Sequence, residues 1–134
     1  MNKRLAVVRA VTPFTASLSN SVNERLAQAQ AILSLSGLSD SSEMPNHIRR
    51  TAHSAALSIV SDVVAELTFG IGATFVNRHI IASVNAPLAK AQAVISLVVH
   101  CGSDLASDDT RELASTAAIG FLQEAMETLE REVL

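Results

Sequence analysis

Residues 26–35 read LAQAQAILSL, and residues 88–97, which lie 62 positions later, read LAKAQAVISL. With the same offset and without a gap, residues 21–67 align with residues 83–129, and sixteen of the 47 aligned positions are identical. Most of the shared positions are apolar or small, as expected of two units that keep one packing scheme while their surfaces diverge. The sequence therefore predicts an internal repeat.

Each unit has the apolar spacing of a helical hairpin. In the first unit, a helical series of apolar residues is followed by Gly37, which is typical of a helix end, and Pro45 can stand in the first turn of the next helix. In the second unit, Asn85 predicts an N-cap and Pro87 a first helical turn. We expect the core to contain Leu26, Leu33, Val60, Leu67, Leu88, Ile95, Leu122 and Leu129.

A single hairpin cannot cover its own apolar face, whereas two hairpins related by an approximate two-fold axis can bury their faces against each other. We therefore expect a mainly α fold, in which two tandem-repeated helical hairpins form a pseudo-two-fold four-helix bundle. The chain is expected to be a single domain (1–134), with an N-terminal segment (1–20), a first hairpin (21–68), a connection (69–82) and a second hairpin (83–134).

The segments that precede the two hairpins leave two interpretations open. They are rich in Val, Ile, Thr and Phe, which favour strands. Residues 4–12 and 73–81 could thus be short strands that pair into a two-stranded ribbon. Runs as short as these do not separate strand from helix by periodicity.

The composition limits the partners and the compartment. Hydrophobic residues make up 49% of the 134 residues and charged residues only 17%, so a partner is expected to cover part of the apolar surface. The net charge of −3 argues against nucleic acid as a partner. No membrane span is expected, because no uncharged apolar run approaches the length that one requires. The single cysteine, Cys101, and the interruption of the first apolar run by Arg9 favour the cytoplasm.

The sequence predicts no catalytic residue, no cofactor-binding residue and no metal ligand. His47 and His53 are six positions apart, which does not place two ligands on one face of a helix. The glycines at 70 and 72 lack the further glycine and the lysine of a phosphate-binding loop. The only local basic cluster contains Arg49, Arg50 and His53, and it is a candidate contact for an anionic ligand or for an acidic partner helix.

These observations predict a regulatory or interaction protein that is not an enzyme. It would act through apolar helical surfaces on another protein or on a second copy of itself, so that a homo-oligomer such as a dimer is expected. The alternative is a module that binds a small apolar ligand in a pocket between the hairpins. Such a pocket would be lined by residues such as Leu33, Val60, Ile95 and Leu122, with His53 or His100 as the polar contact.

Overall fold

The computed structural model describes residues 2–37, 45–70, 78–100 and 108–133, and all of them except Pro45 are helical. The elements are α1 (Asn2–Gly37), α2 (Asn46–Ala65), the π-helical turn η1 (Glu66–Gly70), α3 (Arg78–His100) and α4 (Asp108–Val133). The prediction of a mainly α fold is confirmed for this part of the chain.

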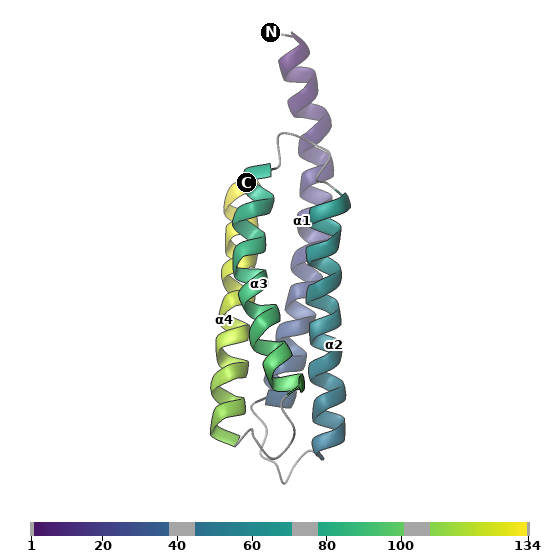
Figure 1. Cartoon of the computed structure of the whole chain (residues 1–134). Coiled ribbons are helices and arrows are strands. Elements are labelled where there is room, and N and C mark those ends of the chain that lie inside the picture. Colours follow the sequence, from purple (N-terminus) through teal and green to yellow (C-terminus); the bar gives the residue numbers. More distant parts are fainter. Residues whose placement is uncertain (1, 38–44, 71–77, 101–107, 134) are drawn as a thin grey trace.

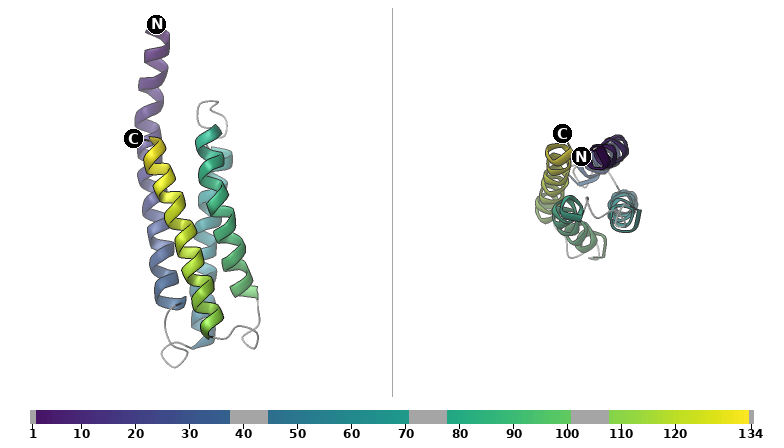
Figure 2. Two further views of the ribbon diagram at one scale, coloured as in Figure 1. Left: turned by 90° about the vertical axis from the view of Figure 1, so that its left-hand side faces the viewer. Right: turned by 90° about the horizontal axis from the view of Figure 1, so that it is seen from above.

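The four long helices pack against one another as a bundle in which successive helices run in opposite directions (Figure 1). α1 contacts α2 and α4, and α3 contacts the same two helices, so that α1 and α3 lie on one diagonal (Figure 2). At one end of the bundle, α1 and α3 finish and α2 and α4 begin. We call this end the turn end. The opposite end, where η1 and α4 finish, is called the junction end.

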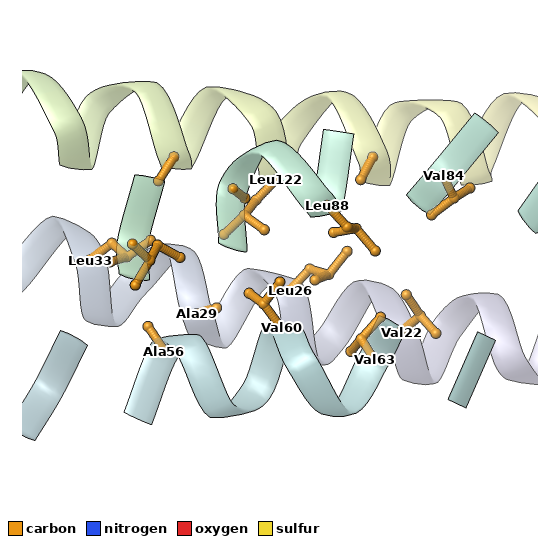
Figure 3. Packing of buried hydrophobic residues seen from close by; sticks show 14 of the residues in the cluster. Val22, Leu26, Ala29, Leu33, Ala56, Val60, Val63, Val84, Leu88 and Leu122 are labelled. Carbon is orange, nitrogen blue, oxygen red and sulfur yellow. The ribbon is translucent and has the colours of Figure 1, made fainter. Parts of the chain in front are cut away.

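The core runs along the bundle axis and consists of apolar residues at spacings of three and four. Figure 3 shows side chains from several helices converging on this axis. Burial of one large aliphatic side chain contributes about 1.5–3 kcal/mol, so this series is the main source of stability. The core residues are Val22, Leu26, Ala29, Leu33, Ala56, Val60, Val63, Leu67, Val84, Leu88, Ala91, Ile95, Ala118, Leu122, Ala125 and Leu129. All eight side chains expected in the core are among them.

Pro45 sets the start of α2. Its backbone is extended, with φ −60° and ψ 146°, and it lies just before the helix rather than in the first turn. The Pro45 carbonyl accepts hydrogen bonds from the backbone N–H groups of Ile48 (3.1 Å) and Arg49 (3.0 Å). The Arg49 bond is the first regular bond of the helix, and the Ile48 bond satisfies one of the donors that a helix start leaves unsatisfied, without a side-chain cap.

The expected ribbon is not supported, because residues 4–12 are part of α1 and are helical. The apolar residues Val7, Val11, Phe14 and Leu18 have spacings of four, three and four, which suit a helix that continues into the first hairpin. In the second segment, residues 73–77 lie outside the described residues, and residues 78–81 are the start of α3. No strand occurs in the part of the chain that the structure describes.

The predicted start of the second hairpin is also wrong. α3 begins at Arg78, so that Asn85 and Pro87 lie inside the helix and not at its first turn. Pro87 is buried and has no N–H group, so the Ser83 carbonyl lacks its usual donor four residues later. Local rules favour a cap at Asn85 and a first-turn proline at Pro87, whereas the helix begins about two turns earlier.

One described segment, Ile81–His100 of α3, is long and apolar enough to cross a membrane by length and composition alone. Four of its side chains, Val84, Leu88, Ala91 and Ile95, belong to the bundle core. Core helices of bundles pass the same test, so this finding is weak evidence for a membrane span.

Candidate functional site

Four polar side chains form a buried cluster near the turn end, which we call the His53 cluster. Arg49 and His53 come from α2, and Arg111 and Ser115 come from α4. All four are buried, although α2 and α4 are diagonal helices that do not contact each other directly along their backbones. The cluster therefore bridges the interior of the bundle.

His53 makes a hydrogen bond with each of its ring nitrogens. Nδ1 lies 2.9 Å from the Arg49 carbonyl oxygen, and Nε2 lies 3.4 Å from the Ser115 hydroxyl. Because a carbonyl can only accept, the Nδ1 atom carries the proton and donates it. In the neutral ring Nε2 is then an acceptor, and the Ser115 hydroxyl donates to it.

The surroundings of His53 favour this neutral form. Burial lowers the pKa of His53 below its ordinary value of 6.5, since the charged ring would lose its hydration. The hydrogen bond to the Arg49 carbonyl opposes this effect, and the nearby positive charges of Arg111 and Arg49 reinforce it. The net effect is a lowered pKa.

Gly37, the last residue of α1, lies close to Ser115 of α4. A Cβ atom on Gly37 would overlap with both Oγ and Cβ of Ser115. No described glycine has a positive φ, so Gly37 is required here for space and not for a left-handed backbone. On the side of α1, the His53 cluster is thus bordered by the backbone of Gly37 and not by a side chain at that position.

The Ser115 and His53 pair has the residue types of a nucleophile and a base, but it lies inside the bundle. Both side chains are buried, and a substrate would have to enter the packed interior to reach Ser115 Oγ. Among the described residues, no group of three metal-binding side chains occurs. The two hydrogen bonds satisfy both ring nitrogens of His53, and the bond to Ser115 links diagonal helices.

The structure separates the three residues of the predicted basic contact. Arg50 is exposed, whereas Arg49 and His53 are buried and face the interior. A contact between the predicted basic residues and an acidic partner remains a prediction. Sequence reasoning missed the pairing of His53 with Ser115; the signal that could have found it is the repeat, because 53 and 115 differ by the same 62 positions.

Large apolar side chains are exposed at the turn end. Leu35 and Leu97 lie near the ends of α1 and α3, and Ile48 and Leu113 lie near the starts of α2 and α4. Their exposed fractions are 69% for Leu35, 66% for Leu97, 47% for Ile48 and 72% for Leu113. We call these four residues the turn-end apolar residues.

Two open hollows adjoin the turn-end apolar residues on α3 and α4. The first has a volume of about 500 Å³ and is lined by Ala93, Ser96, Leu97 and His100. The second has a volume of about 400 Å³ and is lined by Asp109, Glu112, Leu113 and Thr116. Each hollow thus combines one exposed leucine with polar neighbours.

Comparisons of this chain with protein-family models, with curated proteins and with solved structures gave no match.

Proposed function

We propose that this protein is a non-enzymatic interaction protein that binds another protein through the turn-end apolar residues. The observation that carries the proposal is their placement. Among residues 20–37, 47–68, 81–100 and 109–131, the large hydrophobic side chains that are exposed all lie in the first or last two turns of helices at one end of the bundle. Water contact with large apolar side chains is unfavourable, so a partner that covers them gains free energy.

Charged residues beside the leucines would orient the partner. Asp109 and Glu112 share a hollow with Leu113, so the matching surface would carry an apolar anchor next to a basic group. Among the described residues, the lining of the hollow at Leu97 contains no acidic residue, and it contains His100. A partner that presents an amphipathic helix with one basic edge would supply both the apolar anchor and the basic group.

We also propose that the bundle is a fused dimer of two equivalent hairpins related by a pseudo-two-fold axis. The sixteen core residues support this proposal, because every one in the first hairpin has a core counterpart 62 positions later. The eight pairs are Val22 and Val84, Leu26 and Leu88, Ala29 and Ala91, Leu33 and Ile95, Ala56 and Ala118, Val60 and Leu122, Val63 and Ala125, and Leu67 and Leu129.

Polar contacts give the pseudo-two-fold proposal independent support. Gln30 donates to Gln123 (3.1 Å), and Gln92 donates to Ser61 (3.1 Å). Gln92 is the counterpart of Gln30 in the repeat, and Gln123 is the counterpart of Ser61, because each pair of positions differs by 62. The two hydrogen bonds are therefore equivalent under the repeat. His53 and Ser115 are counterparts of each other, and contact between counterparts is expected close to a two-fold axis.

Site-specific photo-crosslinking in the cells that express the protein tests the interaction. A photoreactive residue would replace Leu35, Leu97 or Leu113 in turn, and the matched control would place it at Ala89, an exposed position of α3 outside this end. We expect the turn-end positions to form adducts with the same protein and the control position to form none. Equal adducts at all positions, or none at any, would contradict the proposal.

A second candidate function is the binding of a small apolar ligand, and the hollow at Leu97 favours it. Its volume of about 500 Å³ is within the usual range for small-molecule pockets. The four residues first expected to line such a pocket, Leu33, Val60, Ile95 and Leu122, are instead packed in the core. A ligand at this hollow should raise the melting temperature, and Leu97→Ser should remove that rise.

A further inference from the structure

The first part of α1 has no neighbouring helix among the described residues. Figures 1 and 2 show α1 extending beyond the junction end, past the other three helices. α1 begins at Asn2, whereas the first α1 residue in the described core is Val22. At a rise of about 1.5 Å per residue, residues 2–19 span roughly 27 Å. We call residues 2–19 the projecting segment.

The sequence of the projecting segment continues the spacing of the core. The buried series of α1 includes Val22, Leu26 and Ala29. Towards the N-terminus the same spacing of three and four continues through apolar residues at 18, 14, 11 and 7. A helix of this length is only marginally stable in water without packing, so this apolar series requires a partner surface.

The charge of the projecting segment identifies a surface that would suit it. The segment contains Lys3, Arg4 and Arg9 and no acidic residue. At the junction end of the bundle, α4 exposes Glu127 and Glu130, neither of which has a cationic partner among the described residues. Glu66, at the same end, is already bound to Arg25, with Oε2 2.6 Å from Nη2.

We propose that two copies of the chain dimerise end to end, through antiparallel pairing of their projecting segments. Continuity with the core supplies the apolar contact, because the same helical stripe that packs inside one bundle would pair with its copy between two bundles. In this arrangement the basic start of each segment reaches the junction end of the other copy, beside Glu127 and Glu130. A parallel pair would instead place the basic residues of the two copies together, which is unfavourable.

This dimer involves the end of the bundle opposite to the turn-end apolar residues. It therefore does not depend on the proposed binding of another protein, and each proposal can fail without the other. The dimer would be isologous, since each copy contributes the same basic segment and the same acidic end.

Charge reversal in the full-length chain tests the proposal. The first variant is Lys3→Glu with Arg4→Glu, the second is Glu127→Lys with Glu130→Lys, and the third combines all four changes. The control variant, Asp109→Lys with Glu112→Lys, reverses two exposed acidic residues of α4 at the turn end. Light scattering over a wide concentration range gives the mass, and circular dichroism verifies that each variant remains helical.

We expect the unmodified chain and the control to dimerise. Each two-residue reversal should weaken dimerisation at least about tenfold, and the combined variant should recover it, because opposite charges again face each other. A chain that is monomeric at all concentrations would overturn the proposal, as would a dimer that is unaffected by the reversals at residues 3 and 4. Binding of a monomer to phosphatidylserine vesicles, with loss of binding on reversal of Lys3 and Arg4, would also overturn it and assign the segment to membranes.

Discussion

His53 Nε2 lies 3.4 Å from Ser115 Oγ inside the bundle and joins two helices that are diagonal to each other. The neutral imidazole accepts this bond while its Nδ1 atom donates to the Arg49 carbonyl. Protonation would convert Nε2 into a donor and would place a positive charge beside two guanidinium groups. The stability of the bundle should therefore respond to the titration of one residue.

The first prediction concerns pH. The pKa of His53 is lowered below 6.5 in the folded chain. At pH values between this lowered pKa and 6.5, the unfolded chain therefore binds more protons than the folded chain. The contribution of His53 to the free energy of unfolding is thus complete above 6.5. It decreases as the pH falls through this window, by at most about 1.4 kcal/mol per pH unit.

Denaturant titrations from about pH 8 to about pH 5 measure this effect. His53→Gln should flatten the pH dependence in this range, and His100→Gln, a change at an exposed histidine, should leave it intact. Identical slopes for the His53 variant and the unmodified chain would show that His53 is not the group responsible.

The second prediction concerns two glycines in helices. Gly37→Ala should lower the free energy of unfolding by about 1–3 kcal/mol, because the new methyl group would overlap with Ser115 and the helices would have to separate. At Gly120 a Cβ atom would meet nothing within 4 Å. Gly120→Ala should therefore stabilise the chain by about 0.5–1 kcal/mol through helix propensity.

Chemical denaturation of the two glycine variants gives both values. A further variant that combines Gly37→Ala with Ser115→Gly should be less destabilised than the sum of the single changes, because the serine atoms that cause the overlap are absent. Equal effects at Gly37 and Gly120 would contradict the close approach of α1 to α4.

The third prediction tests the equivalence of the hairpins. Leu26→Ala and Leu88→Ala remove counterparts in the repeat, and both side chains are fully buried. Each change should cost about 2–5 kcal/mol, whereas Leu35→Ala and Leu97→Ala, at exposed counterparts, should cost only a few tenths of a kcal/mol. A loss at Leu26 or Leu88 that is as small as at the exposed positions would argue against equivalent packing.

The core could be predicted from the sequence because apolar spacing directly encodes which face of a helix is buried. Leu26 and Leu122 were found in this way without knowledge of the neighbours. The extent of α1 was harder to predict, since residues 4–12 combine β-branched side chains with a helical spacing. The N-terminus of α3 was missed because Asn85 and Pro87 have local preferences for a helix start, and these were overridden by the longer helix.

The repeat relates His53 to Ser115, but the burial of the His53 cluster could not be predicted, because it depends on tertiary neighbours. Arg49, Arg50 and His53 are close in sequence and all polar, so local reasoning assigns them together to the surface. Burial of His53 becomes possible only because α4 supplies Ser115 and α1 ends in a glycine beside it. The exposure of Leu97 and Leu113 likewise depends on which face each helix turns inward.

The binding of a partner protein at the turn end is tested most directly by titration calorimetry with the protein that crosslinks there. We expect Leu97→Ser combined with Leu113→Ser to weaken binding at least about tenfold, since both anchors are lost. Lys90→Ser, a change at another exposed position of α3, should leave the affinity unchanged. Equal affinities for the leucine double variant and the unmodified chain would contradict the proposed interaction surface.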